Sequence, residues 1–190
     1  MTRVTIEIIY GDITELFVDA IVNPNNKWLL SGSGLCGTIY RKAGKEILET
    51  TTRKICQVEF NGSVPCGSAV ATDSHSLNCK MIIHVVPPKY FIDPVESLEE
   101  CYINALIVAD EQQCTTIAFP AIGIGINKIP IDQTFNYISE ALEKFKPTVL
   151  NHVIFCLNDK HTENLYQEKF SKQTICNLSS ASAGVKRIRK

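Results

Sequence analysis

Short apolar runs alternate with longer amphipathic stretches along most of the chain, and this alternation constrains the fold more than any other feature. Runs that are short and mostly apolar throughout, as buried strands are, lie at about 4–10, 20–23, 68–72, 81–86, 115–119 and 152–157. Stretches with helical spacing of apolar residues lie at about 37–43, 45–56, 95–113, 132–145 and 162–171. The pattern predicts an α/β sandwich whose strands are covered on both faces and are largely parallel in the second half.

The length of the chain predicts a single folded domain. A chain of 190 residues can bury one sizeable core, and neither an internal repeat nor a long linker interrupts the pattern. We expect the domain to span residues 1–171. A flexible tail is expected at 172–190, because the small and polar run 179–184 is followed by the basic end VKRIRK.

Charge and cysteine usage narrow the class of protein. A net charge of −1 gives no general attraction to nucleic acid or to a membrane, so binding of nucleic acid is expected at most through the basic tail.

The sequence also indicates where the protein is located. The apolar runs are about half as long as a bilayer requires, and the start MTRVTIEIIYGD lacks a signal peptide's apolar region. Eight cysteines occur singly, without a C-x-x-C pair. We therefore expect an intracellular protein, cytoplasmic or nuclear, with no metal site and no cofactor.

A first glycine loop, residues 24–37, follows the predicted strand 20–23. Gly32, Gly34 and Gly37 match the pattern G-x-G-x-x-G, which is the fingerprint of dinucleotide-binding enzymes. That fingerprint needs a tight turn from strand to helix, but here eight residues, 24–31, separate the strand from the first glycine. A dinucleotide-dependent oxidoreductase therefore stays a weak alternative.

A second glycine loop, residues 120–130, follows the predicted strand 115–119 and carries Gly123 and Gly125. Glycines allow close backbone approach, so that successive N–H groups can point at phosphate oxygens. Either loop alone could be an ordinary turn. Two such loops after two strands of one domain favour a diphosphate held by backbone amides, which needs no cluster of basic side chains.

Five blocks of sequence, in order between about Val4 and Phe170, resemble the macrodomain family. They are G-D-I-T (11–14), V-D-A-I-V-N-P-N-N (18–26), G-T-I-Y-R-K-A-G (37–44), I-I-H-V-V-P-P (82–88) and I-A-F-P-A-I-G-I-G (117–125). The resemblance implies a three-layer α/β/α sandwich with a mixed, centrally parallel sheet. It also implies a cleft for ADP-ribose at one end of that sheet.

The resemblance assigns roles to individual residues. Asp12 would accept a hydrogen bond from the adenine amino group, and Ile13 would supply a neighbouring backbone donor. Asn23 would brace the first glycine loop, and Asn26 would reach the distal ribose. The remaining predicted contacts with ribose and phosphate are Gly32, Gly34, Cys36 and Gly37 in the first loop and Gly123, Ile124, Gly125, Ile126 and Asn127 in the second.

Several of these residues also have ordinary structural interpretations. Asp12 could be a turn aspartate, and Asn23 is as easily structural as ligand-contacting. His84, in an apolar run, is interpreted as a core histidine with satisfied hydrogen bonds rather than as an acid or base. Trp28 could cap the cleft or only cover the loop.

Departures from the family's hydrolytic branch favour binding over catalysis. Cys36 stands where that branch has a water-holding aspartate, and Asn127 and Ile129 stand at its aromatic positions. The pattern I-G-x-G-x-N looks closer to macrodomains that recognise ADP-ribose without removing it. We therefore expect the partner to be ADP-ribose or an ADP-ribosylated protein. Removal of mono-ADP-ribose from protein side chains, with Asn26 as the catalytic residue, is the alternative, and a redox role for Cys36 is a further hypothesis.

Overall fold

The computed structural model describes residues 4–182, with side chains as far as Ser171. Within that range its strands are β1 (Thr5–Tyr10), β2 (Ala20–Pro24), β3 (Ala69–Asp73), β4 (Met81–Val85), β5 (Thr116–Phe119) and β6 (His152–Leu157). Its helices are η1 (Ile13–Glu15), which is a 3-10 helix, α1 (Gly34–Ala43), α2 (Lys45–Phe60), α3 (Ser97–Glu111), α4 (Ile131–Lys144) and α5 (Lys160–Ser182).

The strands form one mixed sheet in the order β1-β6-β5-β2-β4-β3. Every pairing is parallel except that of β3 with β4. The carboxyl ends of β1, β2, β4, β5 and β6 therefore lie along the same edge of the sheet. The loops that leave this edge are the ones in which an open α/β sheet binds its ligands.

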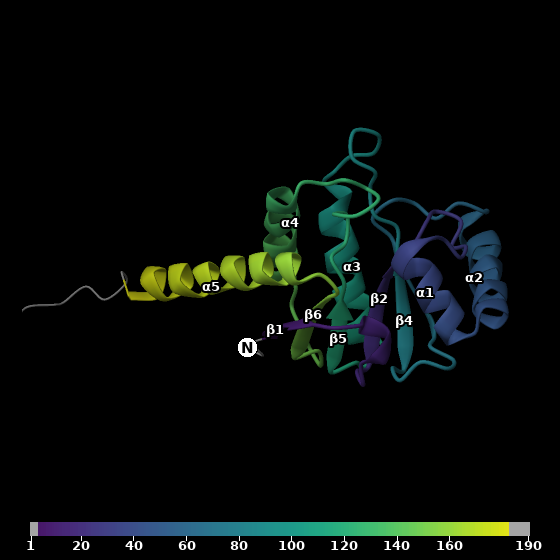
Figure 1. The fold of residues 1–190 in the computed structure, drawn as a ribbon, viewed down its shortest axis with the longest axis horizontal. Helices are drawn as coiled ribbons and strands as arrows, with labels where there is room; N and C mark the ends of the chain where they lie inside the picture. The colour runs from purple at the N-terminus through teal and green to yellow at the C-terminus, as the bar shows by residue number, and fades with distance from the viewer. Residues whose placement is uncertain (1–3, 183–190) are drawn as a thin grey trace, which may run out of the picture.

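Helices cover both faces of the sheet, in three layers (Figure 1). Adjacent side chains of β2 point to opposite faces, as pleating requires. Val22 belongs to a buried cluster with Tyr102 of α3 and Phe135 of α4. Ile21 belongs to a second cluster, with Ile39 of α1. The predicted three-layer α/β/α sandwich with a mixed, centrally parallel sheet is confirmed.

Helix ends differ from the predicted ones more than strand ends do. Helix α2 continues to Phe60, four residues beyond the prediction, because its last turn points mainly to solvent and gives no apolar signal. It ends where Asn61 adopts a left-handed conformation (φ 51°) and donates its N–H to the carbonyl of Cys56. Helix α1 begins at Gly34, three residues earlier than predicted.

Helix α5 continues to Ser182, beyond the predicted end of the domain at residue 171. The basic end VKRIRK lies outside the described residues, and the flexible tail stays a prediction. Among the helices of the described range, none combines the length and the apolar character needed to cross a membrane.

Candidate functional site

The predicted site residues come from the carboxyl edge of the sheet. Asp12 follows β1, the first glycine loop extends from the end of β2, and the second follows β5. Strands β2 and β5 are neighbours, whereas β1 is separated from β2 by β6 and β5. Three steps between neighbouring strands amount to about 14 Å, so the edge can hold an extended ligand between Asp12 and the end of β2.

The glycines of the first loop join that loop to helix α1. A Cβ atom on Gly37 would lie 2.2 Å from the carbonyl oxygen of Gly32, so only glycine permits this approach. Gly34 has a φ of 61°, in the left-handed region that favours glycine. The G-x-G-x-x-G pattern therefore serves loop–helix packing here, at the end of a long loop rather than in the tight turn of a dinucleotide fingerprint.

Asn25, which the sequence interpretation did not select, is central to the first loop. Its side-chain N–H donates to the hydroxyl of Tyr40 (2.9 Å). Its side-chain oxygen accepts from the backbone N–H of Asn26 (2.7 Å) and from the thiol of Cys36 (3.4 Å). Tyr40 in turn donates to the carbonyl of Leu29 (2.7 Å). Buried polar side chains thus fix the loop, and the two consecutive asparagines after a strand were the available signal.

His84 continues this network into the sheet. Its Nδ1 lies 3.0 Å from the amide nitrogen of Asn23 and 3.3 Å from that of Asn25, and its Nε2 lies 3.0 Å from the hydroxyl of Thr72. Two amide donors on Nδ1 place the proton of the neutral ring on Nε2. Burial lowers the pKa of His84 to about 3. His84 is therefore a neutral core histidine, as interpreted from the sequence, and Asn23 links it to the first loop.

Asn26 holds the first loop from within. Its amide nitrogen donates to the carbonyl of Leu30 (2.7 Å), and its oxygen accepts from the backbone N–H groups of Trp28 (3.1 Å) and Leu30 (3.3 Å). An amide NH₂ carries two donors, so the second N–H is the one a ribose hydroxyl could accept from. Trp28 is 52% exposed, and the ammonium of Lys27 lies 5.0 Å from its ring centroid.

Cys36 points beneath the first glycine loop rather than out of it. The residue is 7% exposed and belongs to the core cluster of α1. Burial raises the pKa of its thiol and outweighs the hydrogen bonds from Gly32 and Asn23. A buried neutral thiol does not supply the negative charge of an aspartate. It also lacks the reactivity of a thiolate, so its burial argues against the redox hypothesis.

Asp12 is held by hydrogen bonds at the start of η1. Its Oδ1 accepts from the backbone N–H (2.9 Å) and the hydroxyl (2.6 Å) of Thr14, and its Oδ2 pairs with Lys42 at 2.9 Å. Burial alone would raise the pKa of Asp12, but these hydrogen bonds outweigh it and lower the pKa. The carboxylate is ionised at neutral pH and can act only as an acceptor.

Lys42 is a second residue that the sequence interpretation missed. It extends from α1 to pair with both Asp12 and Glu15. The backbone turn at Asp12 is therefore tied to the helix that follows the first loop. Ile13, beside it, has a buried side chain, which leaves only its backbone for the predicted contact.

The second glycine loop is a tight turn with an exposed tip. Gly123 has a φ of 85°, and a Cβ there would lie 2.8 Å from Cδ1 of Ile129. The N–H of Ile129 donates to the carbonyl of Gly123 at 2.9 Å. Gly125 and Ile126 are exposed at the tip, and a Cβ on Gly125 would meet no atom within 4 Å. Asn127 is half-buried, and its carbonyl accepts from the loop that follows β4.

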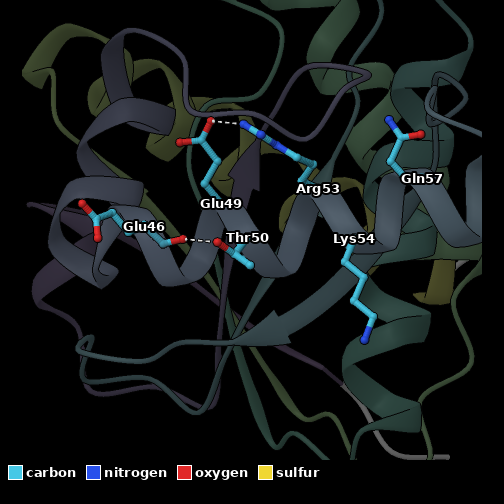
Figure 2. A pocket seen from close by; sticks show the side chains of 6 residues that line it. All are labelled: Glu46, Glu49, Thr50, Arg53, Lys54 and Gln57. Carbon is cyan, nitrogen blue, oxygen red and sulfur yellow. Dashed lines mark hydrogen bonds and ion pairs between the residues drawn. The ribbon is translucent and has the colours of Figure 1, made fainter.

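Two surface hollows among the described residues bear on the location of the site. One, of about 510 Å³, lies on helix α2 and is lined by Glu46, Glu49, Thr50, Arg53, Lys54 and Gln57 (Figure 2). Its lining comes from a single helix whose charges pair locally, with Arg53 3.5 Å from Glu49, and it is not built from the loops at the sheet edge. The other, of about 330 Å³, adjoins the second glycine loop at Ile126, Asn127 and Lys128.

The fold and these loops define a three-layer α/β/α domain with two glycine loops at one edge of its sheet. The Macro domain family model matches residues 22–138, which is more than half of the chain. The chain belongs to the macrodomain family.

Named relatives and solved structures agree with this assignment. The O-acetyl-ADP-ribose deacetylase of Salmonella typhimurium is 34% identical over 175 residues, covering 88% of this chain and 95% of that enzyme. An uncharacterised protein of Saccharolobus solfataricus is 35% identical over 166 residues, covering 87% and 92%. A mutant macrodomain of Oceanobacillus iheyensis with ADPR superposes with a TM-score of 0.84 at 31% identity, covering 90% of this chain and 95% of that one.

Proposed function

We propose that this macrodomain binds ADP-ribose, either free or as a mono-ADP-ribosyl modification on proteins, between its two glycine loops. The observation that carries the proposal is the position of these loops, which follow the neighbouring parallel strands β2 and β5 and leave the same sheet edge. Gly125 and Ile126 are exposed residues, and together with the first loop their backbone N–H groups are proposed to bind a diphosphate. The solved Oceanobacillus iheyensis macrodomains with ADPR and with ADP support this ligand class.

Asp12 and Asn26 give the ligand its proposed direction. The ionised carboxylate of Asp12 would accept from the adenine amino group at one end of the edge. Asn26, at the other end, has a side-chain N–H suited to a ribose hydroxyl. The ends of β1 and β2 are roughly 14 Å apart. This separation favours a ligand in which a diphosphate joins two recognition groups, and it disfavours a mononucleotide.

Binding without robust catalysis is the function that the loops support best. Hydrolysis needs a group that activates or positions water against the reacting carbon. Neither loop contains an aspartate, a glutamate or a histidine, and the buried thiol of Cys36 has a raised pKa. The chain therefore offers no carboxylate where the hydrolytic branch of the family has one.

Removal of mono-ADP-ribose from proteins is the second candidate, favoured by a specific observation. The Salmonella relatives, which match almost their full length, are named O-acetyl-ADP-ribose deacetylases, so hydrolysis of an ADP-ribose derivative occurs among similar proteins. In that case Asn26 would be the catalytic residue that orients ribose and water.

Calorimetry with ADP-ribose and NAD tests the binding proposal. We expect saturable heat with ADP-ribose and weaker binding of NAD, because no residue of the two loops is assigned a contact with a nicotinamide ring. Tight NAD binding with no preference for ADP-ribose would instead support the dinucleotide alternative. Absence of ADP-ribose binding by a folded protein would reject the proposal.

Release of label from mono-ADP-ribosylated proteins separates binding from hydrolysis. Aspartate, glutamate and serine conjugates should be compared, with O-acetyl-ADP-ribose as a further substrate. We expect no release by the natural chain, and Cys36→Asp, which restores the family's carboxylate, is the variant in which release should rise. Release by the natural chain that is lost in Asn26→Ala would establish the hydrolase instead.

A further inference from the structure

An apolar hollow lies beside the second glycine loop and shares only Ile126 and Asn127 with the proposed ADP-ribose contacts. The hollow is lined by residues of the loop between β4 and α3 and of the tip of the second glycine loop. Both loops extend beyond the sheet edge near the start of α3 (Figure 1). Its volume is about 330 Å³, and its lining residues are Lys89, Tyr90, Phe91, Ile92, Ile126, Asn127 and Lys128.

Hydrogen bonds hold the two sides of the hollow in place. The N–H of Tyr90 donates to the carbonyl of Asn127 at 3.1 Å, which joins the two loops. Within the first of them, Asp93 accepts from the backbone N–H of Lys89 at 2.9 Å and donates its own N–H back to that residue's carbonyl at 3.0 Å. The hollow is therefore preformed, which lowers the entropy cost of binding.

Large apolar side chains are exposed in this preformed hollow. Phe91 is 92% exposed, and Ile92 and Ile126 are each 77% exposed. The backbone of Phe91 is in the left-handed region, with φ at 65°, and its ring lies 4.0 Å from that of Tyr90. Exposed apolar groups that gather in one place, rather than singly, are typical of an interaction surface.

The charge of the hollow specifies what it can bind. Lys89 and Lys128 are exposed on its two sides, and the lining residues include no carboxylate. An occupant that presents an apolar side chain flanked by acidic groups would match both features. Ile126 and Asn127 belong both to the hollow and to the second glycine loop, so this occupant would lie next to the bound diphosphate and ribose.

We propose that the hollow binds the polypeptide of an ADP-ribosylated protein next to its modified residue, and that it prefers a segment with an apolar and an acidic side chain. This inference rests on the proposed function, because the ADP-ribosyl group brings the polypeptide to the loop. It assigns the chain a preference among modified proteins that the ADP-ribose contacts alone would not provide.

Peptides that carry the same ADP-ribosyl-serine in two different contexts test the inference. One peptide has leucine and glutamate beside the modified serine, and the other has serine and lysine at those positions. Calorimetry of the natural chain should give an affinity at least about tenfold higher for the first peptide than for the second. A tenfold difference is the size of effect that a few interface side chains commonly produce. Free ADP-ribose is titrated in parallel as the reference.

Phe91→Ser identifies the surface responsible. It should remove the preference between the two peptides and leave the affinity for free ADP-ribose unchanged. Lys89→Gln should reduce the preference, because it removes the charge that would attract the glutamate of the first peptide. Phe17→Ser is the matched control, because Phe17 is 85% exposed but precedes β2, on the amino side of that strand. That control should retain the full preference.

The outcomes distinguish this inference from the proposed function. Equal affinity for the two peptides, with free ADP-ribose bound, would overturn the inference and leave the proposed function intact. No binding of free ADP-ribose would overturn both. Tighter binding of a two-unit ADP-ribose polymer through Phe91, or a dimer of the chain that Phe91→Ser dissociates, would reject the polypeptide in favour of that occupant.

Discussion

The carbonyl oxygen of Gly32 lies only 2.2 Å from the position that a Cβ atom on Gly37 would occupy. The first glycine loop and helix α1 therefore touch backbone to backbone. Neither partner is the end of a flexible side chain, so a larger residue at position 37 can be accommodated only if the loop or the helix moves.

Gly37→Ala is expected to destabilise the protein and to displace the first loop. Alanine would favour the helix by about 1 kcal/mol, but overpacking against backbone costs about 1–3 kcal/mol, and at this distance we expect the clash to dominate. Denaturant unfolding and ADP-ribose titration measure the two effects. Gly32→Ala is the control, because its Cβ would meet its nearest atoms at 3.9 Å. Equal stability of the two variants would contradict the argument.

Tyr40→Phe should loosen the same loop from its other side. The hydroxyl donates to the carbonyl of Leu29 and accepts from Asn25, and both groups are buried. Loss of the hydroxyl leaves them without this partner, so the free energy of unfolding should fall by about 1–3 kcal/mol. Tyr10→Phe, at an exposed tyrosine, should leave it unchanged. An equal effect of the two substitutions would rule out the loop network as the cause.

Asp12→Ala should weaken ADP-ribose binding through loss of the proposed adenine contact. A hydrogen bond to a charged group contributes about 1.5–3 kcal/mol, which corresponds to roughly a 10- to 150-fold increase in Kd. Asp73→Ala provides the control, since Asp73 is an exposed carboxylate that ends the antiparallel strand β3 at the opposite edge. Calorimetry that gives the same Kd for Asp12→Ala and the natural chain would show that adenine binds elsewhere.

The strands could be predicted from the sequence because their signal is local. Short, mostly apolar runs located all six of them, with ends within one residue of those in the described structure. The last turn of α2 was missed because Gln57, Val58 and Glu59 are exposed, so that its hydrogen bonds continue where the apolar pattern stops. Helix ends depend on backbone bonding that side-chain periodicity does not record.

The glycine loops could be located from the sequence, but the residues that hold them could not. Tyr40 fits the apolar face of α1, and nothing near it in the sequence indicates that its hydroxyl reaches Leu29, eleven residues earlier. Lys42 likewise pairs with Asp12 across thirty residues. Such contacts depend on how α1 packs against the sheet, which only the three-dimensional structure gives.

His84 predicts how stability depends on pH. Burial lowers its pKa from the ordinary value of 6.5 to about 3 in the folded protein. Below pH 6.5 the unfolded chain therefore binds a proton that the folded protein does not, so the free energy of unfolding falls as the pH is lowered from 6.5 toward 3. The slope from this one group is at most about 1.4 kcal/mol per pH unit.

Carboxylates with lowered pKa values, such as Asp12, Asp19 and Asp110, act at lower pH, so the contribution of His84 can be isolated. Burial alone would raise the pKa of Asp19 and Asp110, but hydrogen bonds outweigh it and hold each at about 2. Since both folded values lie below 3.8, their stabilisation is present above that pH and is lost mainly as the pH falls from 3.8 toward 2. His84→Gln should therefore flatten the dependence between pH 6.5 and about 4.5, measured by denaturant unfolding, even if its overall stability is lower. His161→Gln, at an exposed histidine, should keep the slope, and a steep slope that persists in His84→Gln would place its origin in another group.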